Sequence, residues 1–397
     1  MTPRTLPITK PCFDEEDFDL VTRPLKSGWV VQGPFVAQFE QLFARFAGVR
    51  HAVASSNCTT ALHLALLASG LCEGDEALVP SFTYVATANA VEYCGAKVRF
   101  CDIDLRTFTL EVTSLPSSLT ERTRAILPVS LFGLPADLPG VQAICEHHGL
   151  FLLEDAACAT GATINGVHCG NWGNGGAFSF HPRKAITTGE GGMFVTADDA
   201  LAAKVRSLRD HGAGKSDLQR HAEKGGSLLP TFEMRGYNYR LTDIQGALGV
   251  GQMHKLERIL AGRRRGAGFY LEALSELPFL LLPHVPTGYG HGYQSFVCLL
   301  TARPGELPTL SDLPALNIRR NKMMALLEEA GVSVRQGTHA VHTLDYYRRR
   351  YNLSDEDFPN SLLADRLSIT LPLFHDFTAE DATYVAENLL AAWRATA

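Results

Sequence analysis

Short apolar runs alternate with segments of helical periodicity through the first half of the chain. The helical segments are residues 35–46, 59–68, 85–93 and 141–148. The apolar runs are residues 52–54, 77–79, 97–101, 125–129, 150–153, 177–180 and 193–196. Runs of this length, bounded by turn residues and alternating with helices, predict βα units and a mostly parallel sheet flanked by helices.

The pattern changes after about residue 240. A long helical stretch at 241–274 is expected to break near Gly262 and Gly266. A strand is expected at 295–300, and helices at 322–330 and 379–393. We therefore expect three parts in an α/β protein. These are an N-terminal arm with little core of its own (1–35), a large domain (36–250) and a smaller α+β C-terminal domain (251–397).

Composition excludes several classes of protein. The chain has 397 residues, 46% hydrophobic and 20% charged, which is typical of a globular protein with a large core. The formal net charge of −6 provides no bulk attraction for nucleic acid or an anionic membrane. No apolar run reaches about 18 residues, and the N-terminus lacks the apolar region of a signal peptide. Nine scattered cysteines without a CxxC pair indicate a cytoplasmic location and no metal site.

Two candidate reactive side chains follow predicted strands. Lys184 lies in a turn between a strand and a glycine-rich hairpin, where shielding near other cations can lower a lysine pKa and allow a Schiff base. Taken alone, Lys184 is better explained as an ordinary surface lysine of a β-turn. Asp155 ends an apolar strand, at the sheet edge where ligands bind in open α/β folds. Its alternative role is a helix N-cap. The Arg263–Arg265 run is expected to be a solvated helix face.

A third group of residues can bind an anion. Asn57, Cys58 and Thr59 precede or open a buried helix, whose N-terminus attracts phosphate. Simple helix capping is the alternative. Tyr84 follows the next strand and offers an aromatic face. An amine, a carboxylate, an anion site and an aromatic ring together meet the requirements of pyridoxal 5′-phosphate (PLP).

Near its full length, the chain also resembles the sugar aminotransferases of the DegT/DnrJ/StrS type, which are PLP enzymes of fold type I. The segments that carry the resemblance include SGWVVQGP, GDEALVPSFTYVATANAV, LLEDAACATGA, GAFSFHPRKAITTGEGGMFVT, GYNYRLTDIQGALGVGQM and LPLFHDFT. The resemblance implies a large domain with a mostly parallel mixed sheet and a smaller C-terminal domain.

The resemblance also implies roles for individual residues. Lys184 would form the Schiff base, Asp155 would pair with the pyridine nitrogen, and Tyr84 would stack on the ring. The implied phosphate ligands are Thr59, Ser179 and the backbone near Asn57 and Cys58. Asn238 would reach the cofactor of a neighbouring subunit, which implies a homodimer with shared sites. Cys158 stands near the ring hydroxyl, where family members often have glutamine. The candidates for substrate contact are Trp29, His181, Arg335, His339 and His342.

The implied reaction is transfer of an amino group from L-glutamate to a keto sugar, expected to be nucleotide-linked. Aminocyclitol transaminases and PLP-dependent dehydratases share the scaffold and stay open as alternatives. Sugar dehydratases of this family have histidine in place of the lysine, so Lys184 argues against a dehydratase. A non-catalytic protein that merely binds PLP or a sugar is the alternative from a different class. The sugar contacts are expected near Trp29, in the polar segment 211–231, and at 335–342.

Overall fold

The computed structural model describes residues 4–214 and 231–396. Most of the predicted polar segment 211–231 therefore lies outside the described residues. A central sheet of seven strands has the order β1-β12-β11-β8-β7-β2-β4. Its strands are β1 (His51–Ser55), β2 (Glu76–Pro80), β4 (Lys97–Cys101), β7 (Thr123–Ile126), β8 (Phe151–Asp155), β11 (Gly175–Ser179) and β12 (Gly192–Thr196). The pairings from β11 to β4 are parallel, whereas β12 runs antiparallel to both of its neighbours. The predicted α/β class and all seven predicted strands are confirmed.

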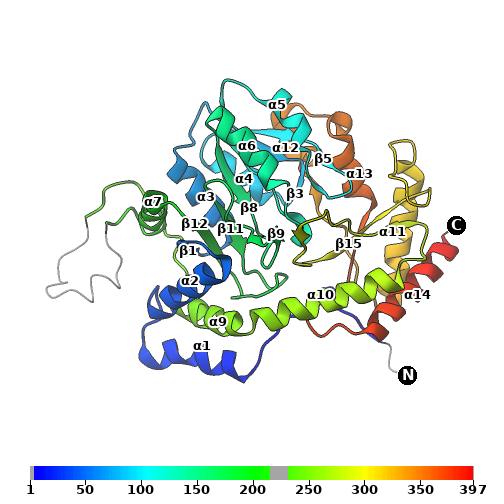
Figure 1. Cartoon of the computed structure of the whole chain (residues 1–397), viewed down its shortest axis with the longest axis horizontal. Helices are drawn as coiled ribbons and strands as arrows, with labels where there is room; N and C mark the ends of the chain where they lie inside the picture. Colours follow the sequence, from blue (N-terminus) through cyan, green and yellow to red (C-terminus); the bar gives the residue numbers. More distant parts are fainter. Residues whose placement is uncertain (1–3, 215–230, 397) are drawn as a thin grey trace.

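Helices cover both faces of this sheet (Figure 1). They are α2 (Pro34–Ala47), α3 (Cys58–Ser69), α4 (Ala86–Tyr93), α5 (Leu115–Ser118), α6 (Leu138–His148), α7 (Asp199–Arg209) and α9 (Asp243–His254). Successive strand residues point to opposite faces. Thus Val53 and Phe194 join the core around α3, while Ala52 and Val195 join the core around α2 and α9. Both faces are apolar because both are buried, as expected for parallel strands.

A second, antiparallel sheet lies in the C-terminal part. It contains β13 (Leu280–Leu281), β15 (Phe296–Leu300) and β17 (Ser368–Leu371), and α10 (Leu256–Ala273), α11 (Leu313–Glu329) and α14 (Ala379–Ala395) pack beside it. Further short strands and helices are β3 (Phe82–Thr83), β5 (Ile103–Asp104), β6 (Thr109–Leu110), β9 (Thr163–Ile164), β10 (Val167–His168), β14 (Tyr289–Gly290), β16 (His339–Ala340), α12 (Asp345–Tyr351) and α13 (Pro359–Leu367). Because β16 pairs with β3, it connects the C-terminal part to the central sheet region.

The break in the long helical stretch lies elsewhere than predicted. Helices α9 and α10 run one after the other along one side of the molecule (Figure 1) and meet at Lys255, whose φ of −110° and ψ of 4° are not helical. Gly262 and Gly266 lie inside α10, so the prediction of a break there was wrong. A Cβ on Gly262 would lie 2.0 Å from the carbonyl oxygen of His375. This glycine therefore serves close packing. The predicted domain boundary at residue 250 falls within α9.

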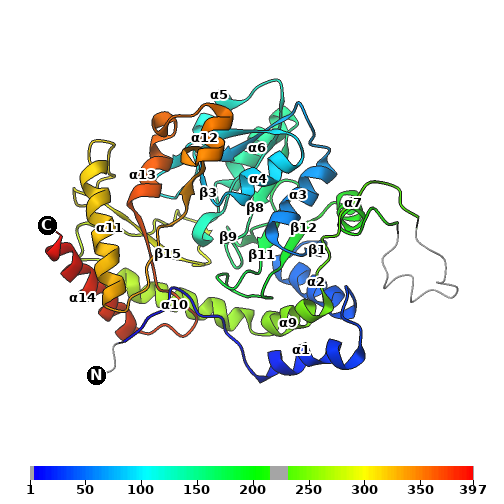
Figure 2. The ribbon, with the colours of Figure 1, turned by 180° about the vertical axis from the view of Figure 1, so that it is seen from behind.

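The N-terminal arm contains a helix that the sequence pattern did not predict. Helix α1 (Glu15–Ser27) packs on α9, and Leu20 and Pro24 are buried there. Ahead of it, Leu6 forms a parallel bridge with Val332 in the C-terminal part. Residues 4–27 thus pass along the molecule from the C-terminal part to α9 (Figure 2).

The expected solvated helix face at Arg263–Arg265 is confirmed for Arg264 and Arg265, which are exposed, and is wrong for Arg263. Arg263 is 1% exposed, and burial lowers the pKa of its guanidinium to about 10. It donates hydrogen bonds to the carbonyl oxygens of Gln294 and Leu373 and to the hydroxyl of Thr9. Buried backbone oxygens replace water as its partners. Among the described helices, none has the length and apolar character needed to cross a membrane.

Candidate active site

The candidate residues converge at the carboxyl-terminal edge of the central sheet. Asp155 ends β8 and Ser179 ends β11, while Asn57 follows β1 and Tyr84 follows β2 and β3. The turn between β11 and β12 carries Lys184 at the same edge. This edge is the expected ligand-binding position in an open α/β sheet.

Lys184 is fixed in a turn held by backbone and hydroxyl contacts. Its amide donates to the carbonyl oxygen of His181, and the buried Thr187 hydroxyl donates to the carbonyl oxygen of Phe180. The Nζ atom lies 3.1 Å from the Cys158 sulfur. Burial lowers the pKa of Lys184, but the acidic groups of Cys158, Cys58 and Asp155 raise it more, so the net direction is upward. The expectation that nearby cations lower the pKa of Lys184 was therefore wrong.

Asp155 is a buried carboxylate with two hydrogen-bond donors. Its Oδ2 accepts from the Thr87 hydroxyl at 2.7 Å, and its Oδ1 accepts from the Ala157 amide at 3.1 Å. Burial raises the pKa of this carboxyl, opposed by these donors and by Lys184. Thr87, in the first turn of α4, was missed by sequence reasoning. Its only signal is a polar residue among alanines directly after the Tyr84 segment.

The N-terminus of α3 forms the third wall of the site. Asn57 caps the helix, because its side chain accepts from the Thr60 amide at 2.9 Å. The start of β12 passes directly against this helix end: a Cβ on Gly192 would lie 2.3 Å from the Asn57 carbonyl. Only glycine allows this approach. The capping alternative for Asn57 is thus correct, and the same residue still lines the site.

These walls enclose a cavity of about 1050 Å³. It is lined by Lys184 and Asp155 together with Asn57, Cys58, Thr59, Tyr84, Cys158, Ser179, His181, Arg183, Arg335 and His339. Thr9, Gln294 and Thr370 from the arm and the C-terminal part also line it. A cavity of this size holds a cofactor and a large substrate together, since ligand sites commonly measure 300–1,000 Å³.

Unpaired cations stand on the cavity wall. Within residues 4–214 and 231–396, the guanidinium groups of Arg183 and Arg335 have no hydrogen-bond or ion-pair partner. His181 lies close to both, and burial, Arg183, Lys184 and Arg335 lower its pKa against the opposing effect of Glu190. A cation at a cavity wall without an acidic partner favours an anionic ligand. No group of three acidic, histidine or cysteine side chains in the described part of the chain is arranged for a metal ion.

Three predicted site residues do not line this cavity. His342 is fully buried: its Nδ1 lies 2.5 Å from the Ser81 hydroxyl, and its Nε2 lies 3.0 Å from the Asp355 carbonyl. It is therefore not placed to touch substrate. Trp29 lies in the loop after α1, where its indole donates to the Gln32 carbonyl. Asn238 is exposed outside the cavity of its own chain.

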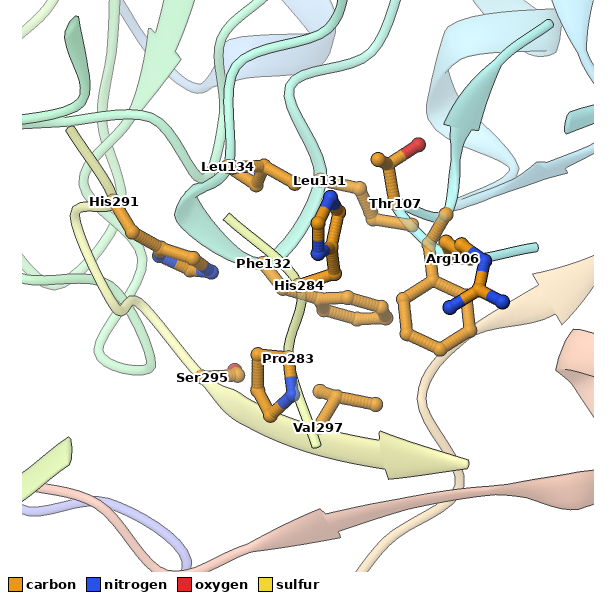
Figure 3. A pocket seen from close by; sticks show the side chains of 11 residues that line it. Arg106, Thr107, Leu131, Phe132, Leu134, Pro283, His284, His291, Ser295 and Val297 are labelled. Atoms are coloured by element: carbon orange, nitrogen blue, oxygen red, sulfur yellow. The ribbon is translucent and has the colours of Figure 1, made fainter. Parts of the chain in front are cut away.

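A second, small pocket, shown in Figure 3, shares part of its lining with the cavity. Leu131, Phe132 and Ser295 line both spaces, and His284 and His291 line only the small one. Its volume of about 10 Å³ matches one water molecule. The small pocket is thus too small for a substrate, whereas the large cavity holds the candidate residues.

With this geometry established, comparison with known proteins defines the class. Residues 11–390 match the model of the DegT/DnrJ/EryC1/StrS aminotransferase family, and the chain belongs to this family. The protein is therefore an aminotransferase, and the predicted family and enzyme class are confirmed.

Individual relatives point to sugar substrates. The chain is 39% identical to the GDP-perosamine synthase of Caulobacter vibrioides over 384 residues, 96% of each protein. Among solved structures it is similar to S. venezuelae DesV in complex with a ketimine intermediate, at 28% identity with a TM-score of 0.85, covering 100% of this chain and 99% of that chain. It is also similar to the E. coli GDP-4-keto-6-deoxy-D-mannose-3-dehydratase with bound hydrated PLP, at 26% identity with a TM-score of 0.84, covering 97% and 99%. The protein is thus a PLP-dependent sugar aminotransferase of fold type I.

The residues present fit the cofactor. PLP needs an amine for its aldehyde, a buried acid for its pyridine nitrogen and donors for its phosphate. Lys184, Asp155 and the N-terminus of α3 supply these groups around one cavity. Asp155 is 4% exposed, and a buried carboxylate of this kind calls for a cationic partner, which a protonated pyridine provides.

Proposed function

We propose that this sugar aminotransferase transfers an amino group from L-glutamate to a nucleotide-linked keto sugar. The observation that carries the proposal is a cavity of about 1050 Å³ whose wall holds two arginines without a side-chain partner among the described residues. Glutamate and a nucleotide sugar are both anionic, and neither would be attracted by the net charge of −6. Arg183 and Arg335 supply the local positive charge that these substrates need.

Lys184 is the proposed catalytic base and acid. When bound, PLP supplies an electron sink that stabilises negative charge on the substrate carbon next to nitrogen. The Nζ of Lys184 removes the proton from that carbon and later returns one. Asp155 would hold a proton on the pyridine nitrogen, because a buried carboxylate calls for a cationic partner. Thr87 and the Ala157 amide keep that carboxylate in place.

The other predicted cofactor residues keep their assignments as proposals. Thr59, Ser179 and the amides near Asn57 and Cys58 bind the phosphate, which is supported by the position of the N-terminal turn of α3 on the cavity wall. Tyr84 contacts the ring. It lines the cavity and is 60% exposed in the absence of a ligand, so its ring is accessible to the cofactor. Cys158 stands beside the ring hydroxyl.

The substrate side is proposed to involve His181, Arg335 and His339, which all line the cavity. For Trp29, we propose substrate contact only in a site that a second chain completes, because Trp29 lies outside the cavity of its own chain. The same reasoning supports a homodimer in which Asn238 of one subunit completes the site of its neighbour. Exposure of Asn238 at the surface leaves it available for that contact.

The test uses the PLP-loaded protein with glutamate and a panel of nucleotide-linked keto sugars and cyclitol ketones. We expect mass spectrometry to detect an amino sugar from a nucleotide-linked substrate, and Lys184→Ala to abolish it. Lys97→Ala, at an exposed lysine of β4, is the matched control and retains activity. Three outcomes would contradict the proposed reaction. Amination of a cyclitol only would indicate an aminocyclitol transaminase, and loss of water without amination would indicate a dehydratase. Binding without turnover would indicate a non-catalytic binding protein.

A further inference from the structure

The Cys158 side chain makes a contact with Lys184 that the proposed reaction does not yet explain. Its sulfur lies 3.1 Å from Nζ, within hydrogen-bond distance, and both side chains line the cavity. Cys158 is half-buried in the loop that follows β8, three residues after Asp155. The resemblance leads us to expect glutamine at this position, and this chain has a thiol there instead.

A thiol suits an amine that gains and loses a proton. The sulfur accepts a hydrogen bond from an ammonium group, and the S–H group donates weakly to a neutral amine. We propose that Cys158 is a positioning residue that holds the ε-amino group of Lys184 at the cavity wall in both protonation states. This inference rests on the proposed role of Lys184 as the catalytic base and acid.

Other groups near the Lys184 amine also affect its protonation, and their effects must be distinguished from that of Cys158. Asp155 of β8 and Cys58 of α3 favour the charged amine, and burial disfavours it. His181, in the same turn as Lys184, is close enough to sense the lysine charge. Burial and Asp155 raise the pKa of Cys58 well above its ordinary value, and Lys184 opposes this shift. Cys158 is the group among these that has a hydrogen bond to Nζ.

The test measures the protonation of Lys184 directly, in full-length protein before cofactor loading. The rate at which an amine-reactive reagent modifies Lys184 is followed by mass spectrometry across pH, with the exposed Lys97 as internal standard. Cys158→Ala removes the acceptor while Asp155 and Cys58 remain. We expect the midpoint of Lys184 modification to fall by about one pH unit, because the ammonium loses a stabilising contact. Cys158→Ser keeps an acceptor and should restore a midpoint near that of the unchanged protein.

Two controls separate positioning from folding. Cys72→Ser changes an exposed cysteine whose thiol donates a hydrogen bond to Asp75, away from the cavity, and should leave the midpoint unchanged. Melting temperatures of all variants identify any loss of structure. An unchanged midpoint in folded Cys158→Ala, or equal shifts in the alanine and serine variants, would overturn the proposal. Because this readout needs no turnover, it is distinct from the Lys184→Ala test of the proposed reaction.

Discussion

Single hydrogen bonds control the charged groups of this site. Thr87 is fully buried, and its hydroxyl contacts both the Thr83 hydroxyl and the Asp155 carboxylate. Asp155 already has a raised pKa because burial outweighs its donors. Its ionised form therefore depends on each donor that remains.

Thr87→Val tests this dependence with a change of almost no volume. Removing a hydrogen bond to a charged group costs about 1.5–3 kcal/mol, so we expect turnover to fall by roughly 10- to 100-fold. Thr87→Ser keeps the hydroxyl and should retain most activity. Steady-state kinetics checks this, and normal turnover in the valine variant would show that Asp155 does not need Thr87.

A buried histidine couples stability to pH. His168 accepts a hydrogen bond from the Gly161 amide through Nε2, and its Nδ1 lies 2.7 Å from the Cys169 carbonyl. This arrangement fits the neutral ring with its proton on Nδ1. Burial lowers the pKa of His168 to about 4, against 6.5 for the free side chain.

The sign of the pH effect follows from that difference. Above pH 6.5 both the folded and unfolded states are neutral at His168, and its full contribution to stability is present. Between pH 6.5 and 4 the unfolded chain binds a proton that the folded chain excludes, so stability falls as pH falls, by about 2 kcal/mol at pH 5. Urea unfolding at pH 7.5 and pH 5 should show a smaller loss in His168→Gln. His63 and His291 contribute equally in the unchanged protein and in the His168→Gln variant. An identical loss of stability in these two proteins between pH 7.5 and pH 5 would therefore contradict this account.

At the scale of elements, α1 is held by a buried ion pair. The Lys255 amine lies 2.6 Å from Oδ2 of Asp17, and both side chains are almost fully buried between α1 and the junction of α9 and α10. Gln252 donates to the same carboxylate, and Asp14 also pairs with Lys255. Removing one member of such a pair leaves a buried charge without its partner.

Lys255→Met should therefore destabilise the protein by about 3–5 kcal/mol and increase hydrogen exchange across α1. The matched control is Arg23→Ala, which breaks the exposed Arg23–Asp19 pair on the same helix and should change stability by at most about 0.5 kcal/mol. Equal effects of the two variants on urea unfolding would show that the buried pair does not hold α1.

At the scale of the whole molecule, we propose that two chains complete each site. If Lys184 of one subunit works with Asn238 of its neighbour, Lys184→Ala and Asn238→Ala lie in different halves of each site. A mixed dimer of the two variants then has one intact site. Because exchange gives half mixed dimers, about a quarter of the activity should return on mixing. No recovery in a mixture of two inactive variants, or a monomer in solution, would contradict the shared site.

Much of the architecture could be predicted because it depends on local patterns. The seven central strands, the helices between them and the position of Asp155 and Lys184 at one sheet edge follow from apolar runs and turn residues. Helix α1 could not be predicted, since its stabilising partner Lys255 lies 238 residues beyond Asp17 in the sequence. Arg263 was misjudged because backbone carbonyls, which no sequence pattern marks, replace its expected water. The division into domains and the cytoplasmic location stay predictions.

The most direct test of the central claim is the absorption spectrum of the PLP-loaded protein during glutamate addition. The account predicts a yellow protein that bleaches with formation of 2-oxoglutarate and regains its colour when the keto sugar is added. Lys184→Ala should complete neither change at a comparable rate, because the group that moves the proton is missing. A protein that stays yellow with glutamate, or a Lys184→Ala variant that cycles normally, would contradict the account.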